Sequence, residues 1–226
     1  MKKTVLLALG VVLVSSTAFA LSITGSKHDM STTTAPSGGI TSGTVKLCEV
    51  CHAPHNAAQA IPLWNRTNPA GASITIYATS STLSSSSKLI TTLATGSISL
   101  HCMSCHAAAP GAANGSVMKT NSLNADVLGG TWTGTITNGG LGTNLTNDHP
   151  VGFNYADSYA GRTANGGTAL QTQAIATGSG AVFFTNGTLV NQMECASCHK
   201  VHDNAIDPFL RVTNAGSALC KACHTN

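Results

Sequence analysis

The sequence has few charged and few aromatic residues, which make up 8% and 4% of its 226 residues. A chain with so few large side chains is expected to build only a thin protein core. Beyond the N-terminus, no stretch approaches the roughly 18 consecutive apolar residues that a membrane-spanning helix needs. We therefore predict no membrane span.

The N-terminus has the pattern of a secretory signal peptide. Lys2 and Lys3 precede an apolar run over residues 4–14, and Ala18-Phe19-Ala20 forms a small-residue cleavage site. Removing residues 1–20 leaves one exported domain, 21–226, with 11 − 2 = 9 basic and 8 acidic residues. Such a balance leaves no large excess of positive charge that would attract nucleic acid. We expect the protein to be secreted, extracellular or at the cell surface.

All eight cysteines occur in C-x-x-C pairs, and a histidine directly follows each pair. The four runs contain Cys48, Cys51 and His52; Cys102, Cys105 and His106; Cys195, Cys198 and His199; and Cys220, Cys223 and His224. This spacing is a haem-attachment signal, because two thioether bonds hold one porphyrin while the following histidine binds its iron. The sequence predicts four covalent haem c groups with these histidines as proximal ligands.

Three other uses of the cysteines account less well for the histidine that follows each pair. Disulfides in an exported protein place no demand on the next residue, yet histidine follows all four pairs. Two zinc sites of four cysteines each would leave these histidines idle. A thioredoxin-like redox pair would occur once, in a βαβ context that is absent here.

Five further histidines are available for the four remaining axial positions. His55 and His202 each follow a proximal histidine by three residues, and from there each is expected to reach a neighbouring haem. His149 precedes a proline, which favours an extended conformation, and an iron bond to His28 would fix a terminus that otherwise frays. We predict these four as distal ligands and leave out His101, which directly precedes a haem cysteine.

Two imidazoles at each iron leave no position for a substrate. The histidine count therefore favours an electron-transfer protein rather than an enzyme. A multihaem reductase would need one iron with an open or exchangeable site, for which departure of His28 is the one route we see.

The predicted fold is mostly irregular, with short helices around the C-x-x-C-H motifs, a few small β-hairpins and long loops wrapped round a chain of four haems. We expect an N-terminal arm over 21–46, a short strand, a loop and a helix over 72–101, and a Gly/Thr-rich loop and hairpin region over 117–190. Within that region, alternation over 131–137 before Asn138-Gly139 predicts a hairpin. Trp64 is expected to pack on a porphyrin and Arg66 to pair with a propionate.

Most of the exported chain resembles the OmcE-type extracellular tetrahaem cytochromes of metal-reducing bacteria, which form the filaments called cytochrome nanowires. The resemblance rests on the four motifs together with Lys27-His28, Ala53-Pro54-His55, 62–66, Asp148-His149-Pro150-Val151, Val201-His202-Asp203 and Phe209-Leu210-Arg211. It implies two histidines at every haem, head-to-tail assembly of the chain with itself, one axial histidine supplied across a subunit boundary, and extracellular electron acceptors. A monomeric periplasmic tetrahaem shuttle would share every motif, so assembly state remains open.

Overall fold

The computed structural model describes residues 23–29, 48, 50–53, 63–78, 83–109, 117–118, 130–131, 139–164 and 170–225. The predicted signal peptide and the predicted distal ligand His55 lie outside these residues. Within them, no helix is long and apolar enough to cross a membrane.

The helices are short, and three of them contain C-x-x-C-H motifs. They are η1 (Gly71–Ser73), α1 (Ser85–Lys88), α2 (Ser99–His106), α3 (Tyr155–Ala164), α4 (Gln173–Gly178), α5 (Cys195–Cys198), η2 (Ala215–Ser217) and α6 (Ala218–Cys223). The second, third and fourth motifs lie in or directly after α2, α5 and α6. Short helices around the motifs and mostly irregular chain between them agree with the predicted fold.

The strands are equally short. β1 (Thr75–Ile76) pairs in parallel with β4 (Asn144–Leu145), and β2 (Val117–Met118) pairs antiparallel with β3 (Gly130–Thr131). The third sheet has the order β5-β7-β6, with β5 (Phe153–Asn154), β6 (Phe184–Asn186) and β7 (Leu189–Met193) all antiparallel to their neighbours. The turn between β6 and β7 contains Gly187 at φ 59°, a conformation that favours glycine.

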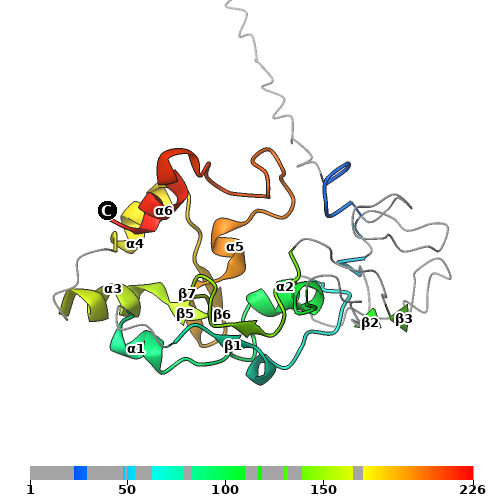
Figure 1. Cartoon of the computed structure of the whole chain (residues 1–226), viewed down its shortest axis with the longest axis horizontal. Coiled ribbons are helices and arrows are strands. Elements are labelled where there is room, and N and C mark those ends of the chain that lie inside the picture. Colours follow the sequence, from blue (N-terminus) through cyan, green and yellow to red (C-terminus); the bar gives the residue numbers. More distant parts are fainter. Residues whose placement is uncertain are drawn as a thin grey trace, which may run out of the picture.

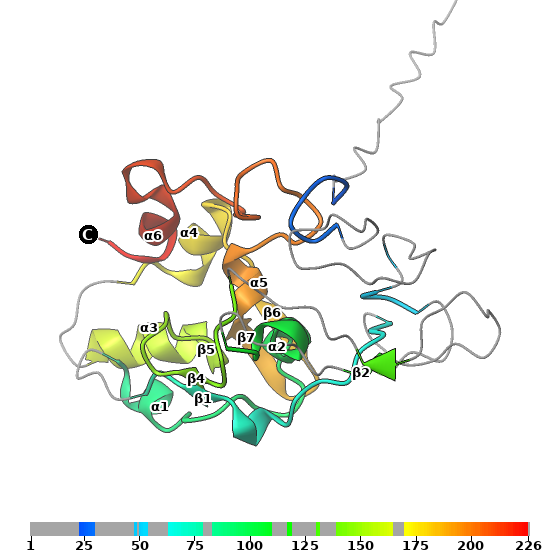
Figure 2. The same ribbon diagram turned by 45° about the vertical axis from the view of Figure 1, so that its right-hand side comes forward.

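The three motif-bearing helices follow one another through the molecule. In Figures 1 and 2, α5 lies between α2 on one side and α6 on the other, while α4 packs beside α6 and α1 beside α3. This order places the second, third and fourth motifs in sequence along the structure.

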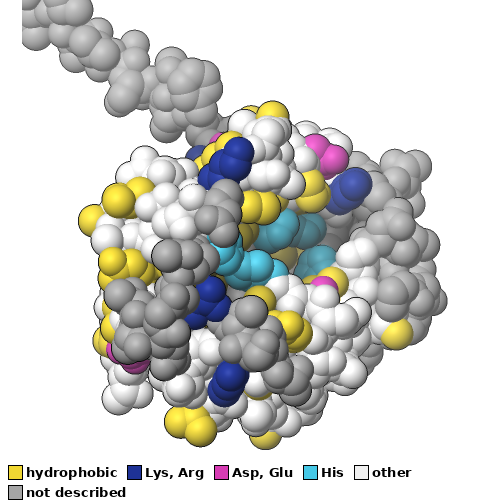
Figure 3. All heavy atoms as spheres, turned by 60° about the vertical axis from the view of Figure 1, so that its left-hand side comes forward, with side chains coloured by type: hydrophobic (Ala, Val, Ile, Leu, Met, Phe, Trp, Pro, Cys, Tyr) yellow, Lys and Arg dark blue, Asp and Glu magenta, His cyan; other side chains and the backbone are white. Residues whose placement is uncertain are grey.

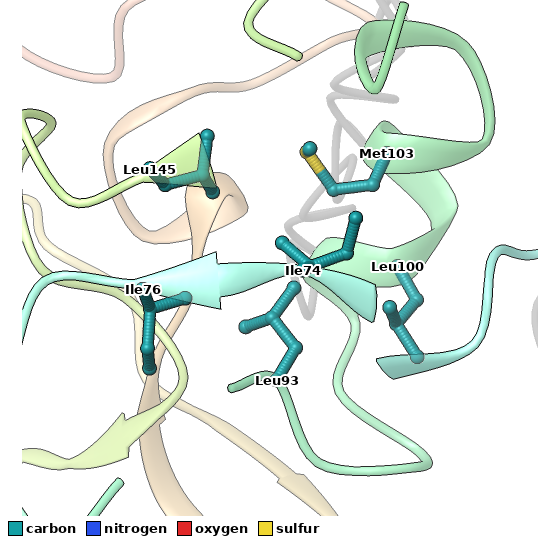
Figure 4. Close-up of a cluster of buried hydrophobic side chains, with 6 residues drawn as sticks. All are labelled: Ile74, Ile76, Leu93, Leu100, Met103 and Leu145. Atoms are coloured by element: carbon teal, nitrogen blue, oxygen red, sulfur yellow. The ribbon is translucent and has the colours of Figure 1, made fainter. Parts of the chain in front are cut away.

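One small hydrophobic cluster supports α2. It consists of six buried side chains that converge from β1, β4, α2 and the segment before α2 (Figure 4): Ile74, Ile76, Leu93, Leu100, Met103 and Leu145. Met103 lies between the two cysteines of the second motif and is 1% exposed. Its side chain therefore packs in the protein core and leaves the motif's cysteines and histidine for another face of α2.

A second cluster supports α6. It contains Phe153, Tyr155, Ala176, Ala181, Met193 and Cys223. The hydroxyl of Tyr155 donates to the backbone oxygens of Gln171, at 2.8 Å, and Cys223, at 3.2 Å. A buried hydroxyl with two acceptors fixes the C-terminal motif against α3 and α4.

The region 117–190 contains more helix than expected. α3 and α4 lie in the stretch for which the sequence predicts hairpins and loops. α3 buries Tyr155 and Ser158 but has no continuous apolar stripe, and α4 is only six residues long with Thr172 as its N-cap. Tertiary packing stabilises both helices, so periodicity alone gives a weak signal. Of the predicted strand over 131–137, only Thr131 is described, and it pairs with Val117.

Candidate haem sites

The backbone around three of the motifs follows one design. The last cysteine of the motif accepts a hydrogen bond from an extended segment, and the following histidine forms an antiparallel bridge with it. The bridges are His52 with Trp64, His199 with Leu210 and His224 with Leu170, and the corresponding bonds are Asn65 N to Cys51 O, Arg211 N to Cys198 O and Gln171 N to Cys223 O. This contact holds each proximal histidine at the end of its turn.

The first and third motifs share a closer likeness. The residue after each proximal histidine donates its N–H to Leu63 or Phe209, at 2.8 and 2.6 Å. Both of these residues have positive φ, 63° and 58°, which is unusual for a side chain other than glycine. The two turns are therefore a structural repeat, which the sequence shows as C-x-x-C-H-x-x-H and as a proline directly before Leu63 and before Phe209.

The structure brings three of the predicted proximal histidines next to three of the predicted distal ones, two pairs edge to face and one pair stacked. The ring centres are 6.1 Å apart for His28 and His106, and 5.9 Å apart for His52 and His202. For the pair formed by His149 and the terminal proximal histidine, His224, the distance is 6.3 Å. Each pair joins residues that are far apart in the sequence.

These distances match two imidazoles bound to one metal ion. An imidazole nitrogen binds a first-row metal at about 2 Å and lies about 1 Å from its ring centre, so rings on opposite sides of one ion have centres about 6 Å apart. None of the eight cysteines forms a disulfide, and the described residues contain no group of three or more side chains arranged for a metal ion. Two opposed ligands without a third suit a planar group such as a porphyrin, which supplies the remaining four nitrogens.

The second ring nitrogen of several histidines is held by the backbone. The Nδ1 atoms of His149 and His199 lie 2.9 and 3.0 Å from the backbone oxygens of Pro150 and Pro208, and that of His106 lies 2.5 Å from Gly139 O. A carbonyl oxygen accepts a hydrogen bond from Nδ1–H, so the proton of the neutral ring is on Nδ1 and Nε2 keeps its lone pair. Such contacts fix the tautomer and the ring orientation of metal-binding histidines.

The surroundings of the three described histidines that we predict as distal ligands favour the neutral imidazole. The pKa of His28 is lowered to about 4, mainly by burial and next by the nearby His106. Burial also lowers the pKa values of His149 and His202, and their ring partners act in the same direction. The neutral imidazole is the form that binds a metal. Figure 3 shows histidine side chains gathered inside a recess on one face of the molecule.

Phe209 positions the N-terminal ligand. Its ring stacks on that of His28 with centres 4.5 Å apart and planes 15° apart, and it is 5% exposed. Phe209 belongs to the repeat around the third motif, so this repeat also orients the histidine that lies next to His106 of the second motif. The sequence alone does not reveal this stack, because it joins residues 181 positions apart.

His199 is the proximal histidine without an opposed ring among the described residues. It lies close enough to His28 to lower the pKa of that side chain. Three of the four predicted distal histidines face other proximal histidines, and His55 lies outside the described part of the chain.

His101 lies apart from the histidine pairs. Its Nδ1 is 3.0 Å from the side-chain amide of Asn68, and its ring centre is 5.1 Å from that of Trp64. Trp64 also contacts His52 edge-on, at 5.7 Å. Trp64 thus lies beside the first motif and contacts both His52 and His101, and the exclusion of His101 as a ligand stays a prediction.

Sulfur atoms of successive motifs approach one another. Cys51 and Cys105 interact electrostatically, Cys102 forms a hydrogen bond with Cys195, and Cys198 lies near Cys223. The four attachment sites therefore lie in the order of the sequence, each beside the next. Arg66 is fully buried, and its positive charge acts on Cys51 and Cys105, at the junction of the first two motifs.

Comparison with known proteins supports this interpretation for the C-terminal part of the chain. Residues 188–226, which contain the third and fourth motifs, match the family described as the doubled CXXCH motif. No curated protein matches the chain. The family match and the C-x-x-C-H runs indicate covalently bound haem c and support a haem-binding electron-transfer protein of the multihaem c-type cytochrome class.

Proposed function

We propose that the chain binds four haem c groups, each between two histidines, and carries electrons outside the cell. The main observation that supports this proposal is the set of three imidazole pairs with ring centres 5.9 to 6.3 Å apart. When bound, each group supplies a reversible one-electron couple. The polypeptide attaches the groups through eight cysteines, orients the axial imidazoles and sets the distances between neighbours.

The fourth axial pair is proposed from the structural repeat. His202, three residues after the third proximal histidine, faces His52 of the first motif. The matching residue three positions after His52 is His55, and the matching partner is His199. We assign His55 to the third haem on this reciprocity, which joins the first and third motifs through an exchange of distal ligands.

The proximity of the motifs supports an electron path through the chain. Sulfur atoms of the first and second, second and third, and third and fourth motifs are neighbours. Thioether sulfurs lie at porphyrin edges, so adjacent sulfurs imply adjacent porphyrins. Short steps between porphyrin edges are what a chain of electron carriers requires.

An electron-transfer role needs no open iron. Under this proposal all eight axial positions are filled by histidine, which leaves no coordination site for a substrate. The reductase alternative requires one exchangeable ligand, for which we consider His28, the predicted ligand opposite His106. Binding of carbon monoxide to about one quarter of the reduced haem in the native protein would favour the reductase.

We further propose that the chain is the repeating subunit of an extracellular filament. Head-to-tail contacts that do not close on themselves give open polymers, and the resemblance to nanowire cytochromes suggests an axial histidine exchanged between subunits. His28 faces His106 of its own chain. A filament that exchanges His28 must reproduce this contact between copies, as in domain swapping.

Two measurements test the haem proposal. The mass of the exported chain should exceed that of the polypeptide by four haem groups, and its visible spectrum should show low-spin haem when oxidised and when reduced. A mass increase of two or three groups, or a high-spin spectrum in the native protein, contradicts the proposal.

Assembly is tested separately. Electron microscopy and light scattering of protein taken from the cell surface should show filaments. Monomers with four six-coordinate haems, recovered from the periplasm, would support the soluble shuttle and exclude the filament.

A further inference from the structure

One acidic side chain is buried where two haem-binding helices meet. Glu194 is 2% exposed. Its Oε2 accepts hydrogen bonds from the hydroxyl of Ser97, at 2.7 Å, and from the hydroxyl and the backbone N–H of Ser99, the latter at 3.2 Å. Ser97 and Ser99 are themselves buried. A fully buried carboxylate is costly, and this one is stabilised by three donors.

Glu194 belongs to the start of both helices. It is the N-cap residue of α5, and its backbone N–H donates to Ser197 Oγ at 2.8 Å. Its carboxylate accepts the N–H of Ser99, the first residue of α2. Ser99 Oγ in turn accepts the N–H of Cys195 at 3.0 Å. A single side chain therefore joins the helices that carry the second and third motifs.

The first cysteines of these motifs meet beside the carboxylate. Cys102 and Cys195 are hydrogen-bonded to each other, and Glu194 acts electrostatically on both sulfurs. In the haem-loaded protein both sulfurs are thioethers at porphyrin edges. The carboxylate thus lies at the junction of the second and third haems. Its contact with Ser99 joins residues that are 95 positions apart in the sequence.

The negative charge of Glu194 shifts the reduction potential of a nearby iron in one direction. Its partners within the described residues are hydroxyl and N–H donors, so its negative charge is solvated but not cancelled. A buried charge is poorly screened by water and salt. A nearby anion favours the more positive, oxidised state of an iron and lowers its reduction potential.

We propose that Glu194 is a positioning residue that holds the second and third haems together. Its charge lowers the reduction potentials of these two haems relative to those of the first and fourth haems. This inference rests on the proposed function, since it requires haem at both motifs.

The potential is tested by spectroelectrochemical titration of the four-haem protein. Glu194→Gln has the same shape and keeps an acceptor oxygen but loses the charge. It should favour reduction of two of the four haems by about tenfold, which corresponds to about 59 mV for one electron. Glu194→Asp should keep the potentials low. Asp157→Asn removes an exposed charge from α3 and serves as the matched control, with all four potentials unchanged.

The positioning role is tested by Ser99→Ala. This change keeps the carboxylate but removes the hydroxyl that links it to Cys195. The magnetic interaction between neighbouring ferric irons, measured by electron paramagnetic resonance, should weaken. The equilibrium constant for reduction of each haem should change less than twofold.

Two results overturn the inference. One is a Glu194→Gln protein with four haems whose titration matches that of Asp157→Asn. The other is an unchanged magnetic interaction in Ser99→Ala. This result would overturn the inference even if Glu194→Gln yields no four-haem protein. A native chain that lacks haem at the second or third motif instead contradicts the proposed function.

Discussion

Replacing His149 with alanine should open one iron in four. The ring of His149 faces that of His224, with centres 6.3 Å apart, and its other contact is the hydrogen bond from Nδ1 to Pro150 O at 2.9 Å. His149→Ala removes the distal imidazole and leaves the two cysteines and the proximal histidine of the last motif intact. The attached haem should remain, with one coordination position empty.

The size of the effect follows from the number of motifs. Carbon monoxide should bind one haem per chain in the reduced variant, which changes about one quarter of the main haem absorbance band. The hydrogen bond lost at Pro150 is worth about 0.5–1.5 kcal/mol, a small part of the 5–15 kcal/mol that stabilises a typical domain. The variant should therefore fold, and the spectral change should report ligation rather than unfolding.

The assay is a titration of the reduced protein with carbon monoxide, followed by absorbance. His101→Ala is the matched control, because it also removes an imidazole but one that contacts Asn68 and Trp64. It should bind no carbon monoxide. The reasoning fails if His149→Ala stays fully six-coordinate, or if His101→Ala binds as much ligand as His149→Ala.

Three further predictions concern other contacts. The double variant His149→Ala/His202→Ala should bind two carbon monoxide molecules per chain, because the two histidines face different proximal partners; one molecule would show that they share an iron. Phe209→Ala removes a buried ring and should cost about 3–5 kcal/mol in denaturant unfolding, with more high-spin haem as His28 loses its support. In the folded chain His28 favours its neutral form, because its pKa is lowered from 6.5 to about 4, mainly by burial, and because the proposed iron bond requires a neutral imidazole. Stability should therefore fall as the pH drops below 6.5, and His28→Ala should flatten this dependence.

The haem-attachment residues could be predicted from the sequence because their chemistry is local. Two cysteines and a histidine within five positions specify one attachment site without reference to the rest of the fold. The sequence predicts a set of four distal histidines but not their partners, and the structure shows ring partners for three of them, whose ligation stays a prediction. The contact between His28 and His106 spans 78 residues, and only the folded chain decides which imidazole faces which.

The repeated turn was only half visible in the sequence. The pattern C-x-x-C-H-x-x-H marks the first and third motifs, and the segments that pair with them share a proline followed by two large apolar residues, but nothing in the sequence shows that they pair. Leu63 and Phe209 occupy the same place, with the same positive φ, although neither is a residue that favours it. A conformation imposed by tertiary contacts leaves no propensity signal, which is also why α3 and α4 were not predicted.

The scarcity of charge in the sequence takes on a meaning once the buried charges are located. Asp29, Arg66 and Glu194 are 5%, 0% and 2% exposed, and each lies next to a motif or an axial histidine. Asp29 follows His28, Arg66 acts on the cysteines that join the first two motifs, and Glu194 lies between the second and third. If the motifs carry haem as proposed, charges at such positions act on the nearby irons with little screening. Under that proposal, a chain with few charged residues places several of them inside, where they set the relative potentials of its haems.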